Sequence, residues 1–231
     1  MKFESAEIPS HLSILDPNSE HAPVFNNVGA VIWIIDSQDE YFQSIRELLA
    51  TAVYLAEHHS RINFEVFIHK TDGLSDEYKY DTFRSIRQQV QDELSDAGYG
   101  DRSVSYYQTS IFDHSIFEAM SKVVMKLLVQ MPYLERVLTK LCSTCKIQKA
   151  YLFDNVTKLY IATDPSPTFL KDYEVCSDYV DTIVDLKQLY GWEDHSEEAD
   201  KEAEDEDYIG ESSVSFDKTG DYYMYAREVN E

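Results

Sequence analysis

A strand pattern followed by a helical pattern occurs three times between residues 28 and 128, and few folds are consistent with this alternation. The strand patterns lie at 28–35, 64–68 and 103–108. After each of them, apolar residues recur every three or four positions, as on one face of an amphipathic helix. Ser37 or Asp39 is expected to cap the first helix. Alternating strands and helices predict an α/β domain whose parallel strands are joined by right-handed crossovers.

A second domain is expected after Pro132, because a proline is poorly tolerated inside a helix and restricts the residue before it. The chain has 231 residues, of which 43% are hydrophobic, and this length suits two domains of about 100 residues each. We therefore expect one domain at 1–131 and a small α+β domain at 132–231. The elements predicted for the second domain are a short helix, a hairpin within 150–163, a helix at about 169–189 and two strands within 212–229.

The charge of the chain excludes several classes of partner. The formal net charge is −23, which opposes long-range attraction to nucleic acid or to anionic lipid. Ten of the acidic residues lie in an insert at 193–207, which is predicted to be a solvated loop. There is no apolar run of about 18 residues, no secretion signal and no cysteine framework for disulfides. We expect a cytoplasmic protein that does not insert into a membrane directly.

The most informative polar residues follow the second strand. Ligands of a parallel sheet bind beyond the carboxyl ends of its strands, which here are Asp36, 69–72 and 109–111. The carboxylate of Asp72 is suited to accept two hydrogen bonds from N1 and the exocyclic amine of guanine, and adenine offers no such pair of donors. The aliphatic stem of Lys70 is suited to lie along the purine. On these residues alone, a polar turn at the strand end is the alternative interpretation.

The surrounding residues favour the nucleotide interpretation. His-Lys-Thr-Asp-Gly-Leu-Ser-Asp at 69–76 is followed by Tyr-Gln-Thr-Ser-Ile-Phe-Asp-His-Ser at 107–115. Together with the strand patterns, these segments resemble the Rag small GTPase family of C/D type over residues 28–191. The resemblance implies a partial Ras-like G domain. It also implies a guanine site formed by His69, Lys70 and Asp72, with Ser110 and Ile111 steadying the base through backbone amides.

The phosphate side of a nucleotide site is missing from the sequence. No Gly-x-x-x-x-Gly-Lys-Ser/Thr segment occurs, and the family's Asp-x-Pro-Gly-Gln motif aligns with Glu-Ile-Pro-Ser-His at 7–11. We therefore assign no catalytic residue and no metal ligand. GTP or GDP is the expected cofactor, weakly held or absent in this chain alone, with magnesium only in a complete site. The Cys142-Ser143-Thr144-Cys145 spacing is typical of zinc or redox sites, but no second pair accompanies it, and structural cysteines are favoured.

The resemblance also implies partners and a pathway. Members of the family pair with a RagA/B-like subunit through a roadblock/longin-like C-terminal domain, which here ends short of its last strands and helix. The heterodimer relays amino-acid sufficiency to the target-of-rapamycin complex on a lysosomal or vacuolar scaffold. Two alternatives stay open, and both follow from the missing phosphate loop. In the first, the chain is a nucleotide-free pseudo-GTPase that acts as a binding module, and in the second it is an incomplete gene model of a full Rag GTPase.

Overall fold

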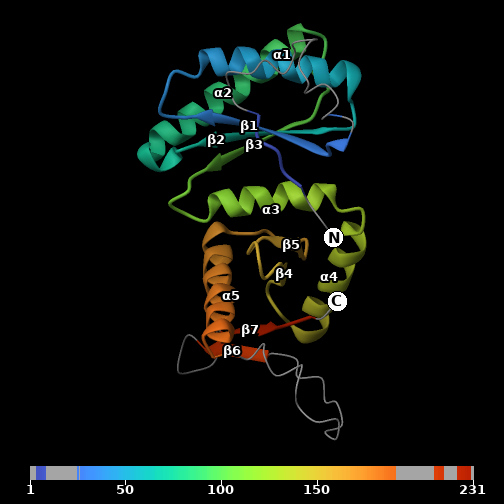
Figure 1. Cartoon of the computed structure of the whole chain (residues 1–231), viewed down its shortest axis with the longest axis vertical. Coiled ribbons are helices and arrows are strands. Elements are labelled where there is room, and N and C mark those ends of the chain that lie inside the picture. The colour runs from blue at the N-terminus through green and yellow to red at the C-terminus, as the bar shows by residue number, and fades with distance from the viewer. Residues whose placement is uncertain (1–3, 9–24, 26, 191–210, 216–222, 230–231) are drawn as a thin grey trace, which may run out of the picture. The chain divides into compact units, whose positions relative to one another are not determined.

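The chain forms two compact units, Met1–Val129 and Gln130–Glu231, each of which is described by itself. No described helix is both long and apolar enough to cross a membrane. The computed structural model describes the residues 4–8, 25, 27–190, 211–215 and 223–229 (Figure 1).

The N-terminal unit is built on a three-stranded sheet. Its strands are β1 (Ala30–Asp36), β2 (Asn63–His69) and β3 (Val104–Thr109), and they run parallel in the order β1-β2-β3. The central strand β2 is buried on both faces, since its five inner residues are all buried. This arrangement confirms the parallel α/β sheet that the repeated strand and helix patterns predict.

Three helices enclose this sheet. Helices α1 (Phe42–His58) and α2 (Asp76–Asp96) lie on one face, and α3 (Ser115–Leu127) lies on the other (Figure 1). Helix α2 ends just before Gly98, whose φ of +84° is the left-handed conformation that suits glycine at a helix end.

The predicted cap of α1 was wrong. The helix begins one turn later than expected, its N-cap is Tyr41, and no side chain caps it. The carboxylate of Asp39 instead accepts a hydrogen bond from the Glu40 backbone N–H at 2.8 Å. Ser37 is 7% exposed, and its backbone N–H continues the sheet by donating to the His69 carbonyl at 2.9 Å. The Asp39 carboxylate is therefore engaged before the helix starts, and the backbone of Ser37 belongs to the end of the sheet, where its buried hydroxyl caps no helical N–H.

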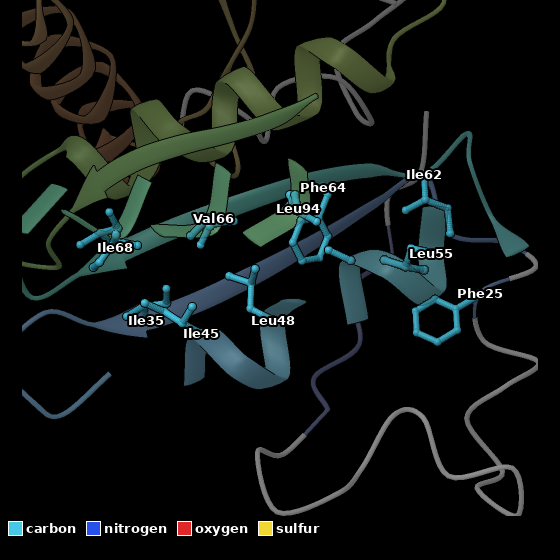
Figure 2. Close-up of a cluster of buried hydrophobic side chains, with 13 residues drawn as sticks. Phe25, Ile35, Ile45, Leu48, Leu55, Ile62, Phe64, Val66, Ile68 and Leu94 are labelled. Atoms are coloured by element: carbon cyan, nitrogen blue, oxygen red, sulfur yellow. The ribbon is translucent and has the colours of Figure 1, made fainter. Parts of the chain in front are cut away.

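The larger core lies between the sheet and helices α1 and α2. Alternate residues of β2, Phe64, Val66 and Ile68, point into this core and meet Leu48 of α1 and Leu94 of α2 (Figure 2). Each fully buried aliphatic or aromatic side chain stabilises the fold by about 1.5–3 kcal/mol. On the opposite face, Phe67 packs with residues of α3 in a smaller cluster. This packing fixes the strands whose carboxyl ends carry the polar residues.

The C-terminal unit is a small α+β arrangement. Pro132 lies in the first turn of its first helix, where a missing backbone N–H costs little. Tyr160 and Tyr173 are almost completely buried, and the Tyr173 ring stacks on that of Phe153. The acidic insert lies outside the described residues. The elements of this unit, with two antiparallel hairpins, are α4 (Met131–Cys145), β4 (Tyr151–Phe153), β5 (Tyr160–Thr163), α5 (Leu170–Tyr190), β6 (Glu211–Ser215) and β7 (Tyr223–Arg227).

Candidate guanine-binding site

The candidate site begins where the three parallel strands end at the same level. Asp36 of β1 pairs with His69 of β2, and His69 pairs with Thr109 of β3. Because the strands are parallel and in register, the loops that follow them leave the same edge of the sheet. Three sequence segments separated by more than thirty residues are thereby brought side by side.

The segment after β2 turns sharply at Lys70. The φ of Lys70 is 60°, in the left-handed region that non-glycine residues seldom adopt. Such a conformation costs on the order of 1–3 kcal/mol and persists only where surrounding contacts impose it. A single 3₁₀ turn at Thr71–Gly73 follows. The turn directs Thr71 into the protein, where it is 6% exposed, and leaves Asp72 at the surface.

Asp72 and Ser110 are in direct contact. The Ser110 hydroxyl donates a hydrogen bond to the Asp72 carboxylate, with an Oγ–Oδ1 distance of 2.5 Å. Ser110 itself has no exposed surface, whereas Asp72 is exposed. A carboxylate offers about four acceptor positions, of which Ser110 uses one. The contact therefore orients the carboxylate and leaves acceptor capacity facing solvent.

The loop after β3 is organised around Ser110. Its backbone N–H donates to the Ser115 hydroxyl at 2.8 Å, and its own hydroxyl accepts from the Phe112 N–H at 3.0 Å. Asp113 in turn accepts hydrogen bonds from the backbone and hydroxyl of Ser115 at the start of α3. The Ile111 side chain is 68% exposed and lies outside the core. These contacts hold the backbone of the loop in one shape without involving the Ile111 side chain.

His69 and Thr71 tie the two loops together beneath this surface. The Nδ1 atom of His69 lies 2.9 Å from the Thr109 hydroxyl, and the Thr71 hydroxyl donates to the Thr109 carbonyl at 3.3 Å. Thr109 is completely buried. His69 therefore contacts the neighbouring strand and helps to hold the two loops together.

Lys70 has a partner that the sequence did not indicate. Its Nζ atom lies 2.5 Å from Oδ2 of Asp36, at the end of the neighbouring strand β1. The hydrogen bond from Lys70 holds the pKa of Asp36 below its usual range and raises that of Lys70 above its own. Both groups are thus charged near neutral pH. The sequence indicated this contact only indirectly: Asp36 and His69 both lie at the ends of predicted strands, and a parallel sheet places such ends next to each other.

Only some of the residues that align with the family's phosphate-side motif, 7–11, are described by the structure. Glu7 is exposed, and the following Pro9, Ser10 and His11 lie outside the described residues. Within the described ranges, no group of three or more His, Cys, Asp and Glu side chains gathers as metal ligands do. The described residues of the candidate site are therefore mainly those on its base side.

The two cysteines of the Cys-x-x-Cys spacing differ in their surroundings, since Cys142 is partly buried and Cys145 is exposed. Both are free thiols at the end of α4. Burial raises the pKa of Cys142, and the charge of Asp164 raises it further. A raised pKa lowers the fraction of reactive thiolate.

Comparison with known proteins places this geometry in a family. Residues 1–180 match the Gtr1/RagA G protein conserved region. The chain is 41% identical over 229 residues to "GTP-binding protein gtr2" of Schizosaccharomyces pombe, covering 99% of this chain and 72% of that protein. It is 45% identical over 191 residues to human "Ras-related GTP-binding protein C", covering 83% of this chain and 48% of the relative.

A third relative agrees with these two. The chain is 44% identical over 184 residues to "GTP-binding protein GTR2" of Saccharomyces cerevisiae, covering 80% of this chain and 54% of the relative. The chain thus spans about half the length of the human and budding-yeast relatives and more of the fission-yeast one. From the matched region and these identities, the chain belongs to the Gtr/Rag family of G proteins and is a subunit of the Gtr2, RagC and RagD type.

Proposed function

We propose that this chain is a guanine-nucleotide-binding subunit whose base site is formed by Lys70, Asp72 and the Ser110–Ile111 loop. The observation that carries the proposal is the hydrogen bond from the buried Ser110 hydroxyl to the exposed Asp72 carboxylate. It orients an acceptor at the carboxyl edge of the sheet, where ligands of parallel sheets bind. GTP or GDP is the ligand, and His69 supports the loop from the adjacent strand.

Asp72 accounts for the selection of guanine. Guanine presents the N1–H and the exocyclic amine as adjacent donors, and a carboxylate is a pure acceptor. A good bidentate contact with a base is worth about 1–3 kcal/mol of discrimination. That range corresponds to roughly 5- to 150-fold preference over a base without the two donors.

The heterodimer and its signalling role belong to the same proposal. The chain pairs with a RagA/B-like subunit, and the pair relays amino-acid sufficiency to the target-of-rapamycin complex on a lysosomal or vacuolar surface reached through partners. Its membership of the Gtr2, RagC and RagD group supports this. The helices and hairpin of the C-terminal unit are compatible with a roadblock-like dimerisation domain.

A second candidate is a nucleotide-free binding module of the same family. Titration of the purified full chain with fluorescent GDP and GTP separates the two. Micromolar or tighter binding that Asp72→Ala abolishes supports the nucleotide site. Asp76→Ala is the matched control, because Asp76 is a fully exposed carboxylate four residues further along. No detectable binding by the wild-type chain would establish the binding module instead.

A change of base specificity gives a sharper test. In Asp72→Asn, the side-chain amide donates where the carboxylate accepted, so it should prefer a base with a carbonyl in place of the exocyclic amine. We expect the variant to bind xanthosine diphosphate more tightly than GDP, and the wild type to show the reverse order. The same order in both proteins would show that Asp72 does not contact the base.

A further inference from the structure

The segment Asp36–Gln38 consists of the last residue of β1 and the two residues after it, and it contacts His69 and Lys70 at the end of β2 at three points. The Ser37 backbone N–H donates to the His69 carbonyl at 2.9 Å. The Gln38 side-chain amide donates to the Lys70 carbonyl at 2.7 Å. The Lys70 ammonium lies 2.5 Å from Asp36, whose other carboxylate oxygen accepts from the Gln38 backbone at 2.9 Å. We call Asp36–Gln38 the β1 loop.

These contacts surround the one strained residue of the site. Lys70 adopts the left-handed conformation, and the β1 loop binds both its side chain and its carbonyl. The Lys70 and Asp36 side chains are 57% and 32% exposed, so their ion pair adds little to global stability. What the pair can do is select one backbone conformation at Lys70. That conformation sets the direction in which Asp72 leaves the strand.

The space beside Gly73 also shows that the Gln38 side chain packs against this turn. A Cβ atom added at Gly73 would lie 2.2 Å from Nε2 and 2.7 Å from Cδ of Gln38. Gly73 does not have a left-handed φ, so its backbone alone does not require glycine. The space that its missing side chain leaves is occupied by the Gln38 amide, the same group that binds the Lys70 carbonyl.

We propose that Asp36 and Gln38 are positioning residues of the guanine site, which hold the left-handed turn at Lys70 and thereby orient the Asp72 carboxylate for the base. The inference rests on the proposed guanine site and adds to it the element that preorganises it. A loop held in its binding shape before the ligand arrives loses less conformational freedom on binding. Neither residue needs to touch the nucleotide.

Hydrogen exchange of the full chain, without any nucleotide, tests the contact itself. The reporters are the Gly73 and Leu74 amides, which donate within the turn to the Lys70 and Thr71 carbonyls. In Gln38→Ala we expect both to exchange about fivefold faster, the factor that corresponds to one neutral hydrogen bond. Asp36→Asn should act in the same direction. Unchanged exchange of both amides in both variants would overturn the proposal.

Two matched controls separate a local effect from a general one. Gln43→Ala removes a glutamine that bonds to Glu47 on the exposed side of α1. Asp181→Asn removes an aspartate from its ion pair with Lys158 in the C-terminal unit. Neither control should alter exchange of the reporter amides.

A double variant tests whether Gln38 and Gly73 act through each other. Gly73→Ala alone should displace the Gln38 side chain and accelerate exchange at Leu74. In the Gln38→Ala background the same change should have no further effect, because the atoms that it would strike are gone. If the two substitutions had additive effects on exchange at Leu74, the packing of Gln38 against Gly73 would be contradicted.

The consequence for binding is measured by the preference for GDP over inosine diphosphate, whose base lacks the exocyclic amine. A misdirected Asp72 should lower this preference severalfold in Gln38→Ala and Asp36→Asn, whereas a general loss of stability would leave it unchanged. A variant with faster exchange and an unaltered preference would refute the positioning role. If the wild type binds no GDP, the proposed function fails, and the exchange result still decides whether the β1 loop holds the turn.

Discussion

The buried carboxylate of Glu65 offers the most direct test of how the N-terminal unit is stabilised. Glu65 lies on the central strand β2 and is 1% exposed. The Lys126 ammonium of α3 donates to its two oxygens at 2.9 and 2.8 Å. Lys126 also donates to the Ser105 hydroxyl at 2.7 Å and to the Tyr107 hydroxyl at 3.0 Å. A single lysine therefore compensates a charge that is otherwise enclosed by protein.

Lys126→Met keeps most of the aliphatic stem and removes this compensation. Breaking a fully buried ion pair from one side costs about 3–5 kcal/mol. The Lys126 side chain is 38% exposed, so water can partly replace its ammonium group, and we expect a loss of about 2–3 kcal/mol. With a urea m-value of about 1.5 kcal/mol/M, the unfolding midpoint of this unit should fall by roughly 1–2 M.

The assay is urea unfolding of the full chain, followed by the fluorescence of Trp33. This residue is part of β1, and its indole N–H donates to the Ser44 hydroxyl at 3.0 Å. The chain has two tryptophans, so Trp192, which lies outside the described residues, is replaced by phenylalanine in every protein compared. Lys79→Met is the control, because Lys79 pairs with the fully exposed Asp76 on α2 and its loss should cost at most about 0.5 kcal/mol.

Two results would refute this reasoning. One is a midpoint shift for Lys126→Met no larger than that for the control. The other comes from Glu65→Gln combined with Lys126→Met, in which no uncompensated charge remains. We expect the double variant to recover most of the lost stability, and a double variant as unstable as the single one would show that the charge is not the cause.

Three further predictions concern single residues. Burial raises the pKa of Asp164, but hydrogen bonds from the Ala150 N–H and from Ser166 outweigh burial, so the pKa lies below its usual value. The ionised carboxylate therefore stabilises the fold above about pH 4, and this contribution should be lost as the pH falls through the lowered pKa. Asp164→Asn should flatten that part of the pH profile and cost about 2 kcal/mol in thermal unfolding at neutral pH, because a charged acceptor is lost. Gly98→Ala should cost about 1 kcal/mol in urea unfolding, because its φ of +84° strains any other residue although the space beside it is open. Burial raises the pKa of Cys176 to about 11. A thiol reagent at pH 8 should therefore modify the exposed Cys145 well before Cys176. Peptide mapping measures the two rates, and equal rates would contradict this prediction.

Much of the architecture was predictable because it depends on short-range periodicity. The three strands, their parallel order and the helices between them follow from the alternation of apolar patterns along the chain. The edge of the sheet at which the candidate residues lie follows from that topology alone. The start of α1 was predicted too early, since a residue type that often caps helices can be placed elsewhere by the fold: Asp39 bonds the Glu40 N–H, and Ser37 continues the sheet.

The candidate site was predictable in its residues and not in its contacts. Lys70 and Asp72 were identified from their place at a strand end, and His69 and Ser110 from the resemblance to the family. The structure brings Asp72 and Ser110 together. Their role toward a nucleotide stays a prediction. The contacts of Asp36 with Lys70 join residues 34 apart, and no periodic pattern spans such a distance.

The strands and helices could be located from the amino-acid pattern alone, which also contains the motif residues that identify the Gtr/Rag family. The tertiary structure decided which side chains meet. Glu65 is an example, because its place in an apolar strand does not reveal a partner 61 residues away on α3. The left-handed turn at Lys70 is another. The physical reason is the same in both cases: local pattern depends on neighbours within a turn or two, whereas charge compensation and backbone strain depend on the register of strands that are remote in sequence.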